Sequence, residues 1–368
     1  MIKIINIDRI NKTSKIKAVV KRLKSIISKK RNFALIYDND PDGLCSAVIT
    51  AKSLERIGKK IVLAKAVAHS SHEIEKIIKK LKNQKIDCII SCDISLDQSV
   101  GALKKIPAHT SLIIIDHHKV YNTFNSGRIF LIKPQLFDKN ADPSQYCSSK
   151  LVYDIFSGIV EINDLDWIAS IGIIADSNYR TWKNFVDATL KKYHLKKYHD
   201  PFKSSAGRIS NLINYSEIYS RRNDRLAFNT VYDSKNYSEI LKKLKRFEVV
   251  EKEIKKQLKK GSKDFERYND LILLKIKSKF KISSIISTKL SMKNPHKTII
   301  VLQESGKGKI FMSARRQDYK VSVNDLLERC TRNIKNSSAG GHIPAAGASV
   351  PNKSYLIFKQ NLLKEIGC

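Results

Sequence analysis

The sequence predicts an α/β protein: a parallel, doubly wound sheet domain, a basic helical connector and a smaller α/β unit. Two observations favour the parallel sheet. Short apolar runs lie at 33–37, 61–68, 88–90, 112–115 and 129–132. Charged stretches with helical periodicity separate them, at 44–57, 71–82 and 95–105. Apolar strands alternating with helices are typical of a sheet that is covered on both faces.

Two more helices are expected after the fifth apolar run, at 144–162 and 166–176. They complete a first domain at 1–180. In an open parallel sheet of this kind, ligands bind outside the carboxyl ends of the strands. Functional side chains are therefore expected where the apolar runs end.

The middle of the chain has a different composition. Residues 180–235 are polar and weakly periodic, whereas apolar positions from 239 to 260 recur at helical spacing and predict one long helix. Residues 241–280 hold fourteen Lys and Arg against six Asp and Glu. We therefore expect a basic middle segment at 181–265 with a connecting helix, and a solvated helix face is the alternative.

The last part of the chain, 266–368, is expected to form the smaller α/β unit. Strand-like runs lie at 271–276, 298–302 and 309–312, and a helical pattern follows at 323–330.

The charge of the chain points to an anionic partner. The 368 residues carry a formal net charge of +34, and 42% of them are hydrophobic, so the chain is expected to fold around ordinary cores. Such an excess of Lys and Arg favours nucleic acid, because neutralised phosphates release counterions. A membrane surface, a small acidic substrate and a compositional bias towards Lys are the alternatives.

The cysteines and the apolar runs limit the choice of compartment. The six cysteines form no CxxC pair, which argues against a zinc ribbon or a thioredoxin-type site. No signal peptide and no run of about eighteen apolar residues is evident, so we expect no membrane span. A reducing cytoplasm is the expected location.

The first apolar run ends in three alternating carboxylates, Asp38, Asp40 and Asp42, followed by Gly43. Carboxylates at alternate positions can share a cation. A calcium loop would need a Glu at its twelfth position, where Ile49 stands, and a preceding helix. Helix capping by Asp42 is another alternative, but it would explain one acid and not three.

Other expected elements also end in ligand-type residues. Asp93 follows the third run, Asp116-His117-His118 follows the fourth, and Asp176 follows the apolar helix at 166–176. Asp93 alone could cap a helix, and a lone buried His is more often part of a core. Together the acids and imidazoles suffice for two divalent ions, and Mn²⁺ or Mg²⁺ suits this ligand set.

The last unit contains a glycine-rich stretch with Gly340, Gly341 and His342, and Arg315 follows a strand-like run. Glycines allow backbone amides to approach phosphate, and a guanidinium can bind phosphate through two hydrogen bonds. A glycine turn with an incidental His is the alternative.

This ordered set of motifs resembles the DHH phosphoesterase superfamily with its DHH-associated carboxyl-terminal domain, and most of all the RecJ-like nucleases of the compact archaeal type. The resemblance covers roughly 30–180 and 280–350. It implies a two-lobed enzyme with a dinuclear Mn²⁺ or Mg²⁺ centre that cuts phosphodiesters in single-stranded nucleic acid or short oligonucleotides.

The resemblance also implies roles for single residues. The predicted metal ligands are Asp38, Asp40, Asp42, Asp93, Asp116, His117 and Asp176. His118 would face the scissile phosphate and act in catalysis together with Asp116 and Asp176. Arg315, Gly340, Gly341 and His342 would bind substrate. Pro41 and Ala339 depart from the family pattern, and neither departure removes a ligand.

The expected function is metal-assisted hydrolysis by a single-strand exonuclease of DNA or RNA, with a role in DNA repair. The alternatives are an oligoribonuclease (nanoRNase), a cyclic-dinucleotide or pAp phosphodiesterase, a pyrophosphatase, and a non-catalytic nucleic-acid or replisome adaptor. A replication or repair protein is a candidate partner. The stretch 191–198, with alternating Lys and Tyr, is either a base-stacking segment or a solvated loop. Polarity, oligomeric state and the choice of DNA or RNA stay open.

Overall fold

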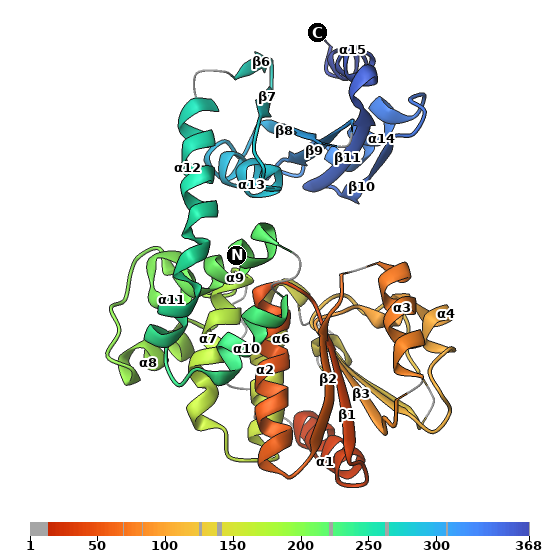
Figure 1. Cartoon of the computed structure of the whole chain (residues 1–368), viewed down its shortest axis with the longest axis vertical. Coiled ribbons are helices and arrows are strands. Elements are labelled where there is room, and N and C mark those ends of the chain that lie inside the picture. Colours follow the sequence, from red (N-terminus) through yellow and green to blue (C-terminus); the bar gives the residue numbers. More distant parts are fainter. Residues whose placement is uncertain are drawn as a thin grey trace. The chain divides into compact units, whose positions relative to one another are not determined.

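The structure is a computed structural model that describes residues 14–68, 70–82, 84–124, 127–137, 142–220, 224–261, 265–306 and 308–367 (Figure 1). The first thirteen residues of the predicted first domain, and Cys368, lie outside the described residues. By its internal contacts the chain divides into two units, Met1–Arg246 and Phe247–Cys368. The predicted middle segment, 181–265, is shared between them, and a separate role for it stays a prediction.

The first unit is built on a five-stranded sheet in which all neighbouring strands are parallel, as the sequence predicted. The strand order is β2-β1-β3-β4-β5. The five strands are β1 (Asn32–Tyr37), β2 (Lys60–Ala66), β3 (Cys88–Cys92), β4 (Ser111–Ile115) and β5 (Ile129–Ile132). The order changes direction between β1 and β3, and in doubly wound sheets such a point marks the ligand-binding crevice.

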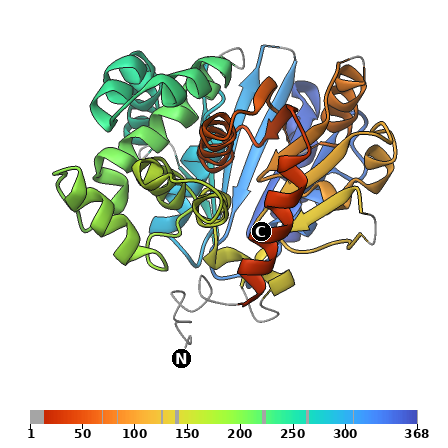
Figure 2. The ribbon, with the colours of Figure 1, turned by 90° about the horizontal axis from the view of Figure 1, so that it is seen from below.

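Helices cover both faces of this sheet. On one face α3 (Ser71–Leu81) and the short α4 (Val100–Leu103) pack over an apolar cluster that includes Ile36, Ile89 and Ile114. On the other face α2 (Pro41–Arg56), α6 (Ser148–Ser157) and α7 (Asp166–Ala175) pack against one another, and α1 (Ser14–Ser28) contacts α6. The longer helices of residues 183–244, yellow-green to green, and the orange α3 and α4 lie on opposite sides of this unit (Figure 2).

The prediction of one continuous helix at 95–105 is wrong. The stretch forms a 3₁₀ turn, η2 (Leu96–Gln98), followed by the single turn of α4. Asp97 in η2 is fully buried, and its carboxylate accepts hydrogen bonds from Lys133 Nζ at 2.9 Å and from the backbone N–H of Tyr121 at 2.7 Å. These buried contacts of Asp97 stand in place of the regular amphipathic helix that the sequence predicted.

The polar stretch 180–235 is largely helical. It forms α8 (Lys183–Lys192), η5 (Pro201–Lys203), α9 (Ser205–Tyr219) and α10 (Asp224–Asp233), and α11 (Tyr237–Leu244) follows. Helix α9 packs against both α7 and α11. Because it is buried on more than one side, its apolar residues do not form a single stripe, and the sequence shows weak periodicity.

The long helix predicted at 239–260 is two helices. One 3₁₀ turn, η7 (Lys245–Phe247), separates α11 from α12 (Glu248–Gly261). Leu244 and Phe247 are both buried. A 3₁₀ turn has three residues per turn, so it places these two side chains, three positions apart, on the same side.

Tyr193 and Lys192 belong to the stretch that was a candidate for base stacking. Both side chains contact other residues of the first unit. The Tyr193 hydroxyl donates to Asp166 at 2.9 Å, its ring packs edge-on against Tyr237, and Lys192 forms an ion pair with Asp166 at 2.9 Å. These contacts favour a structural role for this part of 191–198.

The second unit has a six-stranded mixed sheet in the order β10-β11-β9-β8-β7-β6, in which only β7 and β8 are parallel. Its strands are β6 (Glu266–Tyr268), β7 (Leu271–Ile276), β8 (Thr298–Ser305), β9 (Lys309–Arg315), β10 (Ser338–His342) and β11 (Ala345–Pro351). The helices are α13 (Ser283–Lys293), α14 (Val323–Thr331) and, after the 3₁₀ turn η8 (Asn352–Ser354), α15 (Tyr355–Glu365). The glycine-rich stretch is thus a hairpin, β10–β11, and not a glycine turn.

No helix within the described residues is long and apolar enough to cross a membrane. The cytoplasmic location stays a prediction.

Candidate metal centre

The predicted ligands of the first unit lie where the parallel strands end. The Asp38–Asp42 motif follows β1, Asp93 follows β3, and His117 and His118 follow β4. Since β1, β3 and β4 are neighbours, their carboxyl ends bring these side chains to one edge of the sheet. Asp176 joins them from the carboxyl end of α7.

Three groups of side chains offer ligand atoms within 4.8 Å of one another. The groups are Asp93 with His117 and His118, Asp42 with His117 and Asp176, and Asp38 with Asp40 and Asp93. Asp93 and His117 each belong to two groups, so the three groups form one continuous cluster. Seven of the predicted site residues of this unit thus come together, and Asp116 is not among them.

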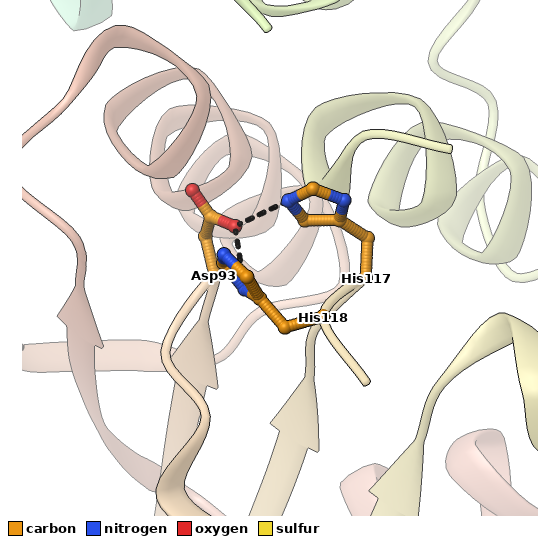
Figure 3. Close-up of side chains that lie close together, drawn as sticks. All are labelled: Asp93, His117 and His118. Carbon is orange, nitrogen blue, oxygen red and sulfur yellow. Dashed lines mark ion pairs between the residues drawn. The ribbon is translucent and has the colours of Figure 1, made fainter. Parts of the chain in front are cut away.

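One carboxylate oxygen of Asp93 faces a nitrogen atom of each of the two imidazole rings (Figure 3). Its Oδ1 is 3.4 Å from His117 Nε2 and 3.8 Å from His118 Nδ1, and it also accepts a hydrogen bond from Ser148 Oγ at 2.9 Å. The backbone of Asp93 has a φ of 62°, a conformation that non-glycine residues adopt infrequently. The strand end is therefore held in a strained turn that directs this carboxylate into the cluster.

Two acids of the first motif also hold helix ends in place. Asp40, not Asp42, is the N-cap of α2, and its Oδ1 accepts from the backbone N–H of Gly43 at 2.8 Å. The carboxylate of Asp42 accepts hydrogen bonds from the first two backbone N–H groups of α6. These are the N–H of Ser148, at 2.7 Å, and the N–H of Ser149, at 3.0 Å. Each Asp42 oxygen makes one of these bonds and keeps a lone pair for a cation.

Gly172 allows α7 to approach this part of the site. A Cβ atom at position 172 would lie 2.1 Å from Ser149 Oγ and 2.6 Å from Asp42 Oδ1. Only glycine fits there. The close approach of α7 explains how Asp176, at its end, reaches Asp42 and His117.

Asp116, a predicted metal ligand, makes hydrogen bonds with neighbouring side chains. Its Oδ1 accepts from His118 Nδ1 at 2.7 Å and from the His118 backbone N–H at 3.2 Å. Its Oδ2 accepts from Lys133 Nζ at 2.8 Å and Ser95 Oγ at 3.1 Å. Four donors thus surround this carboxylate, and its role as a metal ligand stays a prediction.

The two histidines have different surroundings. His117 Nδ1 lies 3.1 Å from the carbonyl oxygen of Pro143, and a hydrogen bond donated there leaves Nε2 as the ligand nitrogen. His118 is bound through Nδ1 by Asp116, and its side chain is 41% exposed, against 10% for His117. His118 is therefore the more exposed of the two imidazoles.

The electrostatics of the cluster suit divalent cations. Burial, followed by the charges of Asp38 and Asp42, raises the pKa of Asp40 to about 7. Burial and Asp42 raise the pKa of Asp176 to about 8, and burial with the neighbouring acids raises the pKa of Asp93 well above its usual range. Crowded, desolvated carboxylates of this kind are costly unless a cation neutralises them.

The charges on His117 and Asp116 follow from the same cluster. Burial lowers the pKa of His117, but Asp176, Asp42 and Asp116 outweigh it and raise that pKa. Burial also disfavours ionisation of Asp116, yet the hydrogen bond and charge of His118, together with Lys133, hold its pKa below the usual range. Asp116 is thus the anion of the site that is already neutralised by the protein.

The residues present fit a metal centre. The cluster offers carboxylate oxygens and imidazole nitrogens, which divalent Mn and Mg ions accept. Next to Asp176, the side-chain Nδ2 of Asn178 donates to Asp176 Oδ2 at 2.6 Å and holds this carboxylate in position. Cys147 lies close by, but burial raises the pKa of its thiol, and a protonated thiol is a poor ligand.

Sequence reasoning missed Lys133, Ser95 and Ser148. Lys133 follows β5 directly, in the position where the other strands carry their functional residues. That position was a usable signal, but in a chain with 69 Lys and Arg a single lysine does not stand out.

The predicted substrate-binding residues lie in the second unit. His342 of β10 and Arg315 of β9 are both paired with Ala345 of β11, so they occupy one cross-strand row. Gly340 and His342 are exposed. Gly341 has a φ of 154°, and a Cβ there would lie 2.5 Å from the carbonyl oxygen of Ala345, so this glycine is required by the hairpin itself.

Comparison with known proteins identifies the class. Residues 32–175 match the DHH family, N-terminal domain, and residues 271–367 match the DHHA1 domain. The chain therefore belongs to the DHH family, whose members are generally phosphoesterases. The predicted family is confirmed.

Solved structures define the fold within this class more closely as RecJ-like. The manganese complex of RecJ from Thermus thermophilus matches with a TM-score of 0.70 and 14% identity, over 97% of this chain and 55% of that one. An exonuclease RecJ bound to manganese matches with a TM-score of 0.71 and 14% identity, over 96% and 94% of the two chains. The predicted fold is thus confirmed, although this chain spans little more than half of the Thermus protein.

A CDC45 from Entamoeba histolytica also shares the fold, with a TM-score of 0.64 and 10% identity over 96% of this chain and 99% of that one. A search of curated proteins finds no match to the sequence.

Proposed function

We propose that this protein is a metal-dependent phosphodiesterase that removes nucleotides from an end of single-stranded DNA or RNA. The observation that supports it best is the continuous cluster of Asp38, Asp40, Asp93, His117 and Asp176. His118, which belongs to the same cluster, is held by a hydrogen bond to Asp116.

Two metal ions would be held by different sides of the cluster. Asp38 and Asp40 would serve one, Asp42 and Asp176 the other, with Asp93 and His117 next to both. Mn²⁺ or Mg²⁺ fits these ligands, and RecJ structures of the same fold are described as complexes with Mn²⁺ or Mg²⁺. When bound, such ions activate a water molecule and neutralise charge on the phosphate.

The Asp116–His118 pair would act on the scissile phosphate. Asp116 fixes the imidazole through Nδ1, as a carboxylate does for a catalytic histidine, and Nε2 is left to face the substrate. A proton at Nε2 can be donated to a phosphate oxygen or to the leaving oxygen. Lys133 and Ser95 keep Asp116 in position, so the ring orientation does not depend on the substrate.

The net charge of +34 supports a polymeric substrate. A dinucleotide offers few phosphates, whereas a longer strand can neutralise many lysines and release many counterions. This favours an exonuclease over an oligoribonuclease or a cyclic-dinucleotide phosphodiesterase.

A labelled single strand of about twenty nucleotides, incubated with Mn²⁺, tests the proposal. The wild type is compared with Asp176→Asn and with Asp233→Asn, which changes an exposed acid at the end of α10. Strands labelled at the 5′ or the 3′ end, in DNA and in RNA, give polarity and substrate. We expect stepwise shortening by the wild type and the Asp233→Asn control and none by Asp176→Asn.

The alternatives give different results. Rapid cleavage of dinucleotides without action on the long strand would favour the oligoribonuclease. Hydrolysis of a cyclic dinucleotide or of pyrophosphate alone would indicate those activities. Binding of the long strand without any hydrolysis, in every metal tested, would favour the non-catalytic adaptor.

A further inference from the structure

A glutamate from the helical middle of the chain reaches the first metal motif. Asn39 lies between Asp38 and Asp40, and its Nδ2 donates a hydrogen bond to Oε1 of Glu217, in the last turn of α9. The two partners are 178 positions apart in the sequence, so tertiary packing and not local structure brings them together. Neither Asn39 nor Glu217 was among the predicted site residues.

Asn39 is the central residue of the turn that carries two predicted ligands. Its backbone N–H donates to Asp38 Oδ1 at 2.8 Å. On one side of it, the N–H of Asp38 donates to the carbonyl oxygen of Cys92 at 3.2 Å. On the other side, Asp40 caps α2 by accepting from the N–H of Gly43 at 2.8 Å. A contact that fixes the side chain of Asn39 therefore steadies the turn between these two carboxylates.

The helices of residues 205–233 also hold the parts of the chain next to this turn. The ring of Tyr37, the residue before Asp38, stacks on Phe228 of α10 with 5.4 Å between the ring centres. Helix α9 packs against α7, whose carboxyl end carries Asp176. These helices thus contact both the end of β1 and the helix that brings Asp176 to the cluster.

Little space is left beside the contact between Asn39 and Glu217. The cavity there, which Ser216 and Ile213 also line, has a volume of about 10 Å³. A cavity of this size has room for one water molecule at most. Ser216 and Ile213 are both buried, so the turn of α9 that carries Glu217 is held in a fixed position.

The carboxylate of Glu217 determines which way the amide of Asn39 faces. An ionised carboxylate only accepts hydrogen bonds, so Asn39 turns its Nδ2 and not its Oδ1 towards Glu217. A partner that both donates and accepts would permit either orientation of the amide. Glu217 therefore selects one conformation of the residue that lies between the two ligands.

We propose that Glu217 is a positioning residue of the metal centre. It acts through Asn39 on Asp38 and Asp40, which form one group of candidate ligands with Asp93, and it is not itself a ligand. Residues that orient metal ligands from outside typically change metal affinity about 10- to 100-fold when they are removed. The inference rests on the proposed function, since it concerns one of the two ions proposed there, and it gives α9 a role that the sequence left open.

Calorimetric titration of the full, chelator-treated chain with Mn²⁺ tests this role without hydrolysis. Glu217→Met removes the acceptor and keeps a side chain of similar length, whereas Glu217→Gln restores an acceptor oxygen. Glu161→Met changes an exposed glutamate of the same unit and is the matched control. Thermal unfolding of each variant in EDTA shows whether the fold is retained.

We expect Glu217→Met to weaken one of the two ions about 10- to 100-fold. The other ion, assigned to Asp42 and Asp176, should bind as in the wild type. Glu217→Gln and Glu161→Met should bind both ions nearly as the wild type does, and Tm in EDTA should be similar in all variants.

Four results would overturn the role of Glu217. They are full affinity for both ions in Glu217→Met, equal weakening of both ions together with a lower Tm, a Glu217→Gln variant as impaired as Glu217→Met, and a wild type that binds no Mn²⁺. The second of these results would indicate a purely structural residue.

A double-mutant cycle tests the path through Asn39. Asn39→Ala removes the amide, and the variant with both Asn39→Ala and Glu217→Met removes both partners. If Glu217 acts through Asn39, the double variant should bind Mn²⁺ no more weakly than the weaker of the two single variants. Losses that add would contradict this path.

Failure of the proposed function shows separately from failure of this inference. A wild type that binds two Mn²⁺ ions, with the expected effect of Glu217→Met on one of them, but hydrolyses no single strand would refute the exonuclease. The role of Glu217 in metal binding would then stand.

Discussion

The ammonium of Lys133 lies 2.8 Å from Asp116 Oδ2, and both side chains are completely buried. Lys133 also contacts the buried Asp97 at 2.9 Å and the carbonyl oxygen of Lys119 at 2.7 Å. One cation therefore neutralises two buried carboxylates, one of which orients His118. This network connects the end of β5 with the histidine proposed to face the substrate.

Replacement of Lys133 by Met should be costly to stability. The change leaves Asp97 and Asp116 buried without their cation, and breaking a buried pair in this way costs about 3–5 kcal/mol. Urea unfolding measures the loss. Lys105→Met is the matched control, because it breaks the exposed pair of Lys105 with Glu75 and should cost less than about 1 kcal/mol. Similar losses for the two variants would show that the buried network contributes little.

Asp116→Asn should separate metal binding from catalysis. We expect Mn²⁺ affinity to stay close to that of the wild type, because Asp116 accepts four hydrogen bonds and lies outside the three groups of candidate ligands. The neutral amide no longer holds the His118 ring in the tautomer and orientation that the carboxylate selects. We therefore expect kcat to fall at least a hundredfold. Calorimetric Mn²⁺ titration and single-turnover kinetics on the same preparation measure both. Loss of Mn²⁺ binding in this variant would instead identify Asp116 as a metal ligand.

The metal-free protein should lose stability as the pH rises. Asp40 and Asp176 have pKa values of about 7 and about 8 in the folded chain, against 3.8 for an ordinary Asp, so the folded chain binds more protons than the unfolded chain. Their contribution is fully present below pH 3.8 and is lost as the pH rises through 7 and 8.

Thermal unfolding in EDTA between about pH 6 and pH 9 tests this sign. We expect Tm to fall by several degrees for the wild type and by less for Asp176→Asn, because one raised carboxyl is gone. Mn²⁺ should cancel the fall, since metal binding displaces the protons. A Tm that rises with pH in EDTA would contradict the crowding of these acids.

Gly172→Ala should disturb the metal centre from the adjacent helix. The new methyl group would lie 2.1 Å from Ser149 Oγ and 2.6 Å from Asp42 Oδ1, so α7 has to move away from them, and Asp176 at its end moves with it. Loss of such supporting geometry typically lowers metal affinity about 10- to 100-fold. Gly101→Ala in α4 is the control, because a Cβ there meets nothing within 4 Å. Equal Mn²⁺ affinities in the two variants would argue against a close fit at Gly172.

The acids and histidines of the site were accessible from the sequence because parallel strands share one carboxyl edge. Asp93 directly follows β3, and one residue separates His117 from the end of β4. Locating the strands in the sequence therefore also located these residues. The contacts of Asp116 with Lys133 and Ser95 were not accessible. Whether a carboxylate binds a metal or a lysine depends on what stands opposite, and Lys133 comes from a different strand.

The missed elements have a common physical cause. Helix α9 is buried on more than one side, and the β10–β11 hairpin is rich in glycine, so neither shows the periodicity by which helices and strands are recognised. The break between α11 and α12, at 245–247, was missed because a 3₁₀ turn has nearly the same number of residues per turn as an α-helix. The spacing of the buried residues along the sequence therefore changes by less than one position. In each case tertiary packing, and not local sequence, determines the element.

The most direct test of the account is a Mn²⁺ titration of chelator-treated protein, followed by hydrolysis of a single strand by the same samples. We predict two ions bound per chain, hydrolysis that appears as they bind, and loss of both in Asp93→Asn, whose carboxylate belongs to two of the three groups of candidate ligands. The absence of bound Mn²⁺, or binding that Asp93→Asn leaves unchanged, would contradict the metal centre.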